Sequence, residues 1–147
     1  MIKQCNIIDF IPHRAPFLFI DAVEDFEPDR KIIIIKRVTA DEQMLVTEND
    51  GNKRFPETLI IEAAAQAVLL FSKLNQVKKN MEEGLFVLGK IKGEFFKQVF
   101  VGDDLKIKVE QVRLVAQGGY ADVEVVVLAE LVAKVEVFFS LVKGDGK

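Results

Sequence analysis

The sequence predicts an α+β fold in which one long central helix is wrapped by a highly bent antiparallel β-sheet. Residues 59–71 form an alanine-rich, almost uninterrupted apolar stretch, which favours a helix buried on nearly all sides, predicted over residues 56–79. The segments around it are rich in β-branched residues and alternate between polar and apolar, as strands do. With 147 residues, we expect a single domain over residues 1–147, large enough to bury a core.

The central stretch carries only two polar side chains between residues 59 and 71, Glu62 and Gln66. They are four positions apart, so they share one face of a helix. Pro56 suits a first helical turn, and Glu57 adds a negative charge near the positive end of the helix dipole. A buried carboxylate must be paired, hydrogen-bonded or protonated. Glu62 is therefore either a satisfied structural residue or a group kept for chemistry, and the spacing leaves both open.

Before the helix, the pattern predicts a short helical turn over residues 6–10, which Asn6 can cap. The two prolines of residues 11–16 require an extended loop. We expect strands over residues 17–26 and 31–39, the second containing four consecutive isoleucines. Residues 40–54 are polar and lack an apolar period, so we expect a loop that leads into the helix.

After the helix, strand follows strand. We expect them over residues 85–91, 92–99, 105–115, 121–128 and 132–142, the second continuing the first or bending around Gly93. Residues 117–120 contain two glycines and are a candidate hairpin turn. Phe95, Phe96 and Phe100 could line a tunnel or belong to the core, and they are interpreted as core residues.

The composition excludes several classes of function. The net charge is −3 and the lysines are scattered, so we expect no nucleic-acid partner. The apolar stretches are too short or too interrupted to span a bilayer, and the first residues lack a signal-peptide pattern, so we expect a cytoplasmic protein without a membrane partner. With one cysteine, Cys5, and one histidine, His13, we expect neither an internal disulfide nor a metal site or cofactor.

Three strings carry a resemblance to a known family. Residues 11–21 look like an LPHR.PFLLVD opening, residues 55–67 look like a PGVLIIEA.AQ helix, and residues 101–103 look like a PGD turn. In order and spacing, the chain resembles the 3-hydroxyacyl-(acyl-carrier-protein) dehydratases of bacterial type II fatty acid synthesis, which have the hot-dog fold.

The resemblance implies a lyase that converts a 3-hydroxyacyl thioester of acyl carrier protein or CoA into a trans-2-enoyl thioester. It implies a dimer whose sheets join edge to edge, with the acyl arm in a tunnel at the interface. By resemblance, Glu62 would protonate the departing hydroxyl, supported by Gln66, while a histidine from the partner subunit removes the C2 proton. A main-chain N–H at the helix start would polarise the thioester carbonyl.

Departures from the family pattern concern the base. The family's catalytic histidine precedes the helix, and an ungapped count back from Glu62 puts that position on Glu48, with only Gly51 of the surrounding motif retained. The glycine at the family's helix start is replaced by Glu57. His13 matches a different histidine, which the family does not use as the base, and it is interpreted as a structural loop residue.

Three functional hypotheses remain open on the sequence. In the first, an altered dehydratase or hydratase divides the acid and base roles between Glu62 and Glu48. In the second, the chain is a non-catalytic or half-site subunit that pairs with a histidine-bearing homologue. In the third, it is a thioesterase acting on acyl-CoA or acyl carrier protein. The sequence leaves open a homodimer, a heterodimer or a higher oligomer.

Overall fold

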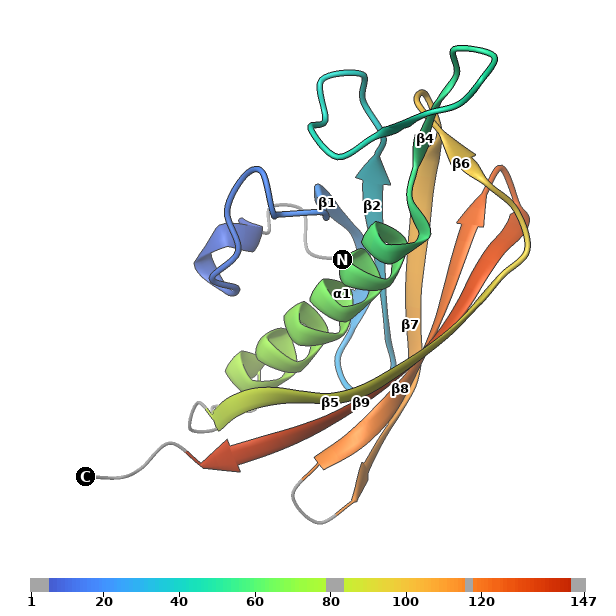
Figure 1. Ribbon diagram of the computed structural model, residues 1–147. Helices are drawn as coiled ribbons and strands as arrows, with labels where there is room; N and C mark the ends of the chain where they lie inside the picture. The colour runs from blue at the N-terminus through green and yellow to red at the C-terminus, as the bar shows by residue number, and fades with distance from the viewer. Residues whose placement is uncertain (1–5, 79–83, 116–117, 144–147) are drawn as a thin grey trace.

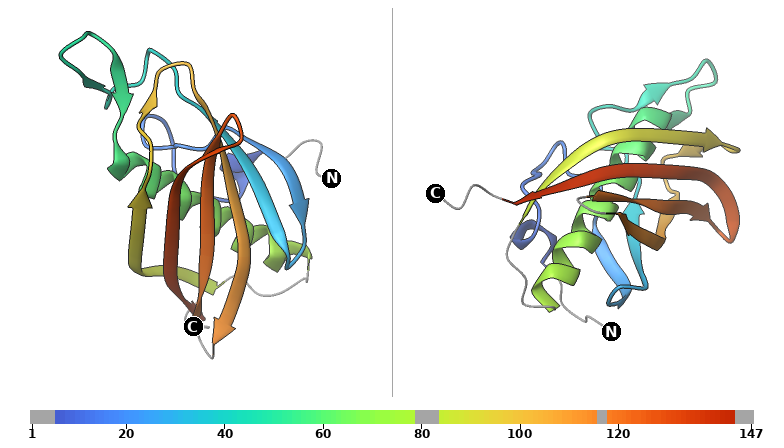
Figure 2. Two further views of the ribbon diagram at one scale, coloured as in Figure 1. Left: turned by 90° about the vertical axis from the view of Figure 1, so that its right-hand side faces the viewer. Right: turned by 90° about the horizontal axis from the view of Figure 1, so that it is seen from below.

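The computed structural model describes residues 6–78, 84–115 and 118–143. A six-stranded antiparallel sheet, in the order β1-β2-β7-β8-β9-β5, curls around the single helix α1 (Figure 1, Figure 2). The predicted α+β architecture and hot-dog fold are therefore confirmed. The elements are η1 (Ile7–Asp9), β1 (Ala22–Glu27), β2 (Lys31–Arg37), β3 (Val46–Thr47), β4 (Lys53–Phe55), α1 (Glu57–Lys78), β5 (Gly84–Phe95), β6 (Val99–Phe100), β7 (Asp104–Val115), β8 (Gly118–Val127) and β9 (Glu130–Lys143).

Helix α1 follows Pro56 directly, close to the predicted start. The carbonyl oxygen of Pro56 accepts hydrogen bonds from the backbone N–H groups of Leu59 and Ile60, which forms the first turn. Ala63, Ala64 and Ala67 are fully buried, and their small side chains let the sheet pack closely against the helix. The core is completed by inward-facing residues of β2, β7, β8 and β9, such as the fully buried Ile34 and its neighbour Ile107 in the register.

Along the long strands, buried and exposed side chains alternate. Val123 and Val125 of β8 are buried against the helix side, whereas Glu124 between them is exposed. The same alternation in β7 buries Ile107 and Val109. One face of the sheet therefore forms the core, and the opposite face carries charge.

Strand β5 runs along one border of this sheet and pairs only with β9. It continues to Phe95 without a break, which agrees with the first of the two alternatives predicted for residues 92–99. The irregular pairing lies between Leu88 and Lys90. The interpretation of Phe95 and Phe96 as core residues is wrong for this chain, because they are 37% and 52% exposed. They lie at the end of the border strand, where the sheet no longer covers them.

The region before the helix differs most from the prediction. Strand β1 begins at Ala22, not at residue 17. The backbone groups of Phe17 and Phe19 form hydrogen bonds with the side chain of Gln66 in α1, so they are not available for strand pairing. Asn6 precedes η1 but makes no side-chain capping bond. The polar segment 40–54, predicted as a loop, contains the short hairpin of β3 and β4, and β4 also pairs with β6.

The turns before and after β8 differ from the turns that the sequence predicts. Gly118, which was expected in the turn over residues 117–120, already lies in β8, and residue 117 lies outside the described residues. Between β8 and β9, Leu128 and Ala129 have φ angles of 49° and 66°. They form a left-handed turn without glycine, so the sequence lacks the usual signal for such a turn. Among the described residues, no helix combines the length and the apolar character needed to cross a bilayer.

Candidate active site

Gln66 joins the opening loop to the helix. Its side chain is 1% exposed, and its Oε1 accepts a hydrogen bond of 2.8 Å from the backbone N–H of Phe19. Its Nε2 donates to the carbonyl oxygen of Phe17, also at 2.8 Å. A buried amide must find such partners or lose stability. Gln66 therefore fixes the loop against the face of α1 that carries Glu62.

Glu62 lies one turn before Gln66 on this face. Its Oε1 accepts from Gln66 Nε2 at 3.2 Å, and its Oε2 makes no hydrogen bond within the described residues. The expectation that Glu62 is buried is wrong for this chain, because its side chain is 43% exposed. The sheet covers the other faces of α1, and this face is covered only by the short loop. The carboxyl group is therefore anchored at one oxygen and open at the other.

His13 is the third member of the cluster, although from the sequence it is interpreted as a structural loop residue. Its Nε2 lies 3.8 Å from Glu62 Oε1, and its side chain is 28% exposed. Its Nδ1 is buried and has no hydrogen-bond partner in the described part of the chain. Because Gln66 draws residues 17–19 onto the helix, it also brings the preceding loop, with His13, next to Glu62.

Glu48 belongs to a different cluster. Its carboxylate accepts a hydrogen bond of 2.5 Å from Arg54 Nε, and Nη1 of the same guanidinium donates to Glu57 at 2.7 Å. The hydrogen bond to Glu48 raises the pKa of Arg54, and the charge of Glu57 acts in the same direction. Arg54 is only 17% exposed, so this ion-pair cluster ties the β3–β4 hairpin to the start of α1. The structure thus brings Glu62, Gln66 and His13 together and holds Glu48 elsewhere.

A cavity of about 270 Å³ lies beside the first turn of α1, bounded by residues such as Leu18, Phe55 and Leu59. Lys36 borders it, with Nζ 2.7 Å from Glu42 Oε1 and 5.6 Å from the centre of the Phe55 ring. The buried ammonium is therefore satisfied within the chain.

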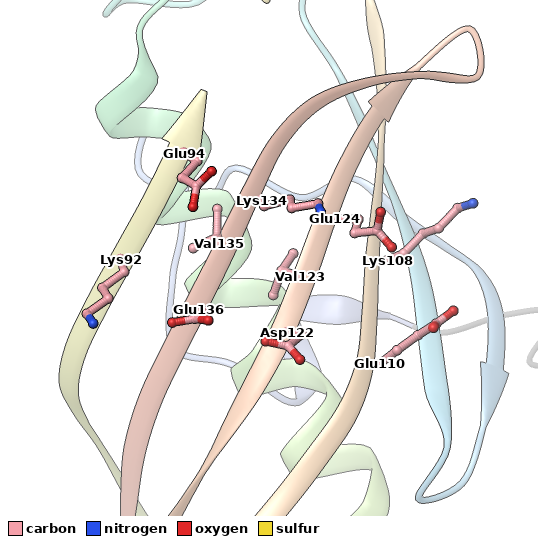
Figure 3. Close-up of a pocket in the computed structure, with 10 residues that line it drawn as sticks. All are labelled: Lys92, Glu94, Lys108, Glu110, Asp122, Val123, Glu124, Lys134, Val135 and Glu136. Carbon is pink, nitrogen blue, oxygen red and sulfur yellow. The ribbon is translucent and has the colours of Figure 1, made fainter. Parts of the chain in front are cut away.

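A larger hollow of about 580 Å³ lies on the outer face of the sheet, away from α1 (Figure 3). It is bordered by charged side chains from β5, β7, β8 and β9: Lys92, Glu94, Lys108, Glu110, Asp122, Glu124, Lys134 and Glu136. These are the outward positions of the alternating strands. The hollow is a solvated charged face and is separated from Glu62 by the sheet.

Comparisons with known proteins agree with this architecture. The sequence model of the ApeP-like family, described as ApeP dehydratase, matches residues 5–138. The chain is 34% identical over 137 residues to a 3-hydroxyacyl-(acyl-carrier-protein) dehydratase FabZ of Clostridium tetani, covering 92% of this chain and 94% of the relative. It is 35% identical over 143 residues to the FabZ of Anoxybacillus flavithermus, with coverages of 96% and 98%.

Among solved structures, the dehydratase heterocomplex ApeI:P from Xenorhabdus doucetiae contains a chain of the same fold, with a TM-score of 0.79, 17% identity and coverages of 95% and 92%. These sequence relationships support a dehydratase-like function on acyl thioesters. Both the family match and the FabZ relatives span nearly the whole chain. The chain therefore belongs to the ApeP-like dehydratase family.

Proposed function

We propose that this chain is one subunit of a shared-site dehydratase, to which it contributes the acid and its partner contributes the base. The substrate is a 3-hydroxyacyl thioester carried by acyl carrier protein or CoA, and the products are a trans-2-enoyl thioester and water. Glu62 is the general acid, Gln66 orients it, and a histidine-bearing homologue is the partner. The site is composed at the interface of the two unlike subunits.

The observation that carries this proposal is the ion pair between Glu48 and Arg54. Glu48 occupies the position of the family's histidine, and a base needs a free lone pair aimed at the substrate. Here the carboxylate accepts from Arg54 at 2.5 Å, and Arg54 also binds Glu57. Using Glu48 as a base would require opening this cluster and leaving Arg54 without one of its partners. The chain therefore supplies the acid half of the site and lacks the base half.

The proposed reaction needs two proton transfers. The partner's histidine removes a proton from C2, and the electron pair is stabilised as an enolate at the thioester carbonyl. The enolate then re-forms its carbonyl, the C2–C3 double bond forms and the C3–O bond breaks. Glu62 gives its proton to the departing hydroxyl, which leaves as water. Oε2 is suited to this step because Oε1 is already bound to Gln66.

Strand β5 supports a partner beside Glu62. This strand of 12 residues pairs with β9 on one side only, and an unpaired edge can pair with a second sheet. Apolar side chains are exposed along it, at Val87, Leu88 and Phe95. A Cβ added to Gly93 would come within 3.4 Å of Ile61, the neighbour of Glu62 in α1. A subunit that extended the sheet at β5 would therefore lie close to the half-exposed Glu62.

The related solved structure is a dehydratase heterocomplex, which favours an unlike partner over a second copy of this chain. A homodimer would carry two acid groups and no family histidine. The alternative in which Glu48 serves as the base predicts activity without any partner. The thioesterase alternative predicts release of a free thiol.

The proposal is tested by co-expressing the tagged chain with the histidine-bearing dehydratase homologue from the same genome. Hydration of a crotonyl thioester, which is the reverse reaction, is followed as loss of the enoyl absorbance. We expect hydration by the co-purified complex and none by the folded chain alone. Hydration by the chain alone that disappears in E48Q would contradict the proposal and support the Glu48 alternative.

A further inference from the structure

His13 is the only histidine of the chain, and the reaction proposed above gives it no role. It nevertheless lies at the candidate site, with Nε2 3.8 Å from Glu62 Oε1. A solvated loop histidine would be expected to point into water, but this side chain is 28% exposed and its Nδ1 is buried. Its position beside the carboxyl group therefore needs an explanation.

The loop that carries His13 is fixed at both ends. Arg14 donates from Nη1 to the carbonyl oxygens of Ile11 and His13, at 2.9 and 2.8 Å, and from Nη2 to that of Ile8, at 3.1 Å. On the other side, the buried Gln66 binds the backbone of residues 17 and 19. Hydrogen bonds on both sides of His13 therefore hold its imidazole beside α1.

Side-chain nitrogens of Gln66 and His13 lie near the same oxygen of Glu62. Gln66 Nε2 is 3.2 Å from Oε1, and His13 Nε2 is 3.8 Å from the same atom. The second distance is about 1 Å longer than a hydrogen bond, a gap typical of catalytic groups that tighten only around a substrate. Oε2 is left free of both donors.

We propose that His13 is a positioning residue for Glu62: its Nε2–H, together with the Gln66 amide, holds Oε1 and so turns the proton-bearing Oε2 toward the substrate. The inference rests on the proposed function, because it assumes that Glu62 is the acid. It assigns the ring proton to Nε2 and makes His13 a residue that acts through Glu62 without touching the reacting atoms. Loss of this contact lets the carboxyl group rotate.

A spectroscopic test uses the chain alone. Because there is one histidine, ¹⁵N-histidine labelling gives one pair of ring-nitrogen signals. We expect the Nε2 signal to be that of a protonated nitrogen and to shift in E62Q. The matched substitution E48Q, at a carboxylate bound to Arg54, is expected to leave it in place. Identical ring signals in the wild type and E62Q, or a proton on Nδ1, would overturn the proposal whether or not the protein is active.

A kinetic test uses the co-purified complex. In H13F, which keeps bulk but removes the donor, we expect kcat to fall about 10–100-fold because the acid is misplaced, with KM changed little. In H13Q the amide Nε2 replaces the imidazole donor, and much of the lost kcat should return. Equal loss in both variants, or loss only in KM, argues for a merely structural loop residue. Loss of activity in E62Q with full activity in H13F refutes the inference alone, whereas full activity in E62Q refutes the proposed function.

Discussion

The side-chain amide of Gln66 lies 3.2 Å from Oε1 of Glu62, one helical turn away, while it also binds the backbone of the opening loop. A single buried side chain thus orients the acid and docks the loop that carries His13. This relationship explains why these two polar residues interrupt an otherwise apolar helix. It also makes Gln66 the residue through which stability and activity are linked.

We predict that Gln66→Leu destabilises the fold. The substitution leaves the carbonyl of Phe17 and the N–H of Phe19 without partners, at a cost of about 1–3 kcal/mol for each group that stays buried. The free energy of unfolding, measured in urea, is expected to fall accordingly.

Asn75→Ala is the control for this substitution. Asn75 Oδ1 also accepts from a backbone N–H, that of Asp29, but at an exposed position. Its replacement is expected to cost about 1 kcal/mol or less, because water can replace the lost bond. Equal losses in the two variants would contradict the anchoring role of Gln66.

Arg54 is predicted to stabilise the junction between the β3–β4 hairpin and α1. Arg54→Leu removes the cation shared by Glu48 and Glu57 and leaves the two carboxylates without it. We therefore expect the free energy of unfolding to fall, although by less than for a buried ion pair because both acids are partly exposed.

A double-mutant cycle with Glu48→Gln measures this interaction. The loss caused by Arg54→Leu should be smaller in the E48Q background, and the coupling should weaken as salt is raised. Independent, additive effects of the two substitutions would show that the ion pair does not hold the hairpin. The same E48Q variant should keep the activity of the complex.

Strand β5 is predicted to be the association edge. Leu88→Glu and Phe96→Glu place charges on side chains that are 43% and 52% exposed along and beyond this strand. Burying such a charge in an interface opposes association, so we expect the Kd of the complex to rise at least about tenfold, a change of about 1.4 kcal/mol. Sedimentation or a titration of labelled subunits measures it.

Leu128→Glu serves as the comparison. Leu128 is an apolar side chain that is 93% exposed, but it lies in the turn between β8 and β9. Its replacement should leave the Kd unchanged. If all three charges weaken the complex equally, β5 is not the specific contact.

Much of the fold follows from pattern alone. The period of the long strands and the apolar helix are local properties, and Glu57–Lys78 was predicted to within one or two residues. The failures have non-local causes. Residues 17–19 look like a strand, yet Gln66, far along the chain, takes their backbone hydrogen bonds. The turn at Leu128 and Ala129 adopts positive φ without the glycine or asparagine that normally reveals it.

The candidate site was predictable only in part. Glu62 and Gln66 stand out because they are polar residues in an apolar helix. The predicted burial is wrong for Glu62, because the spacing of residues along a helix does not show that one helix face is left uncovered by the sheet. His13 could not be joined to them from the sequence, since its place depends on how Arg14 and Gln66 fold the loop back.

The shared site is tested most directly by comparing E62Q and E48Q of this chain in complex with the wild-type histidine-bearing partner. Both substitutions replace one carboxylate by an amide, and the rate of crotonyl-thioester hydration is measured at equal complex concentration. The account predicts that E62Q lowers kcat by about a hundredfold or more, as expected for loss of a general acid, while E48Q keeps the wild-type rate. Full activity in E62Q, or inactivity in E48Q with the complex intact, would contradict it.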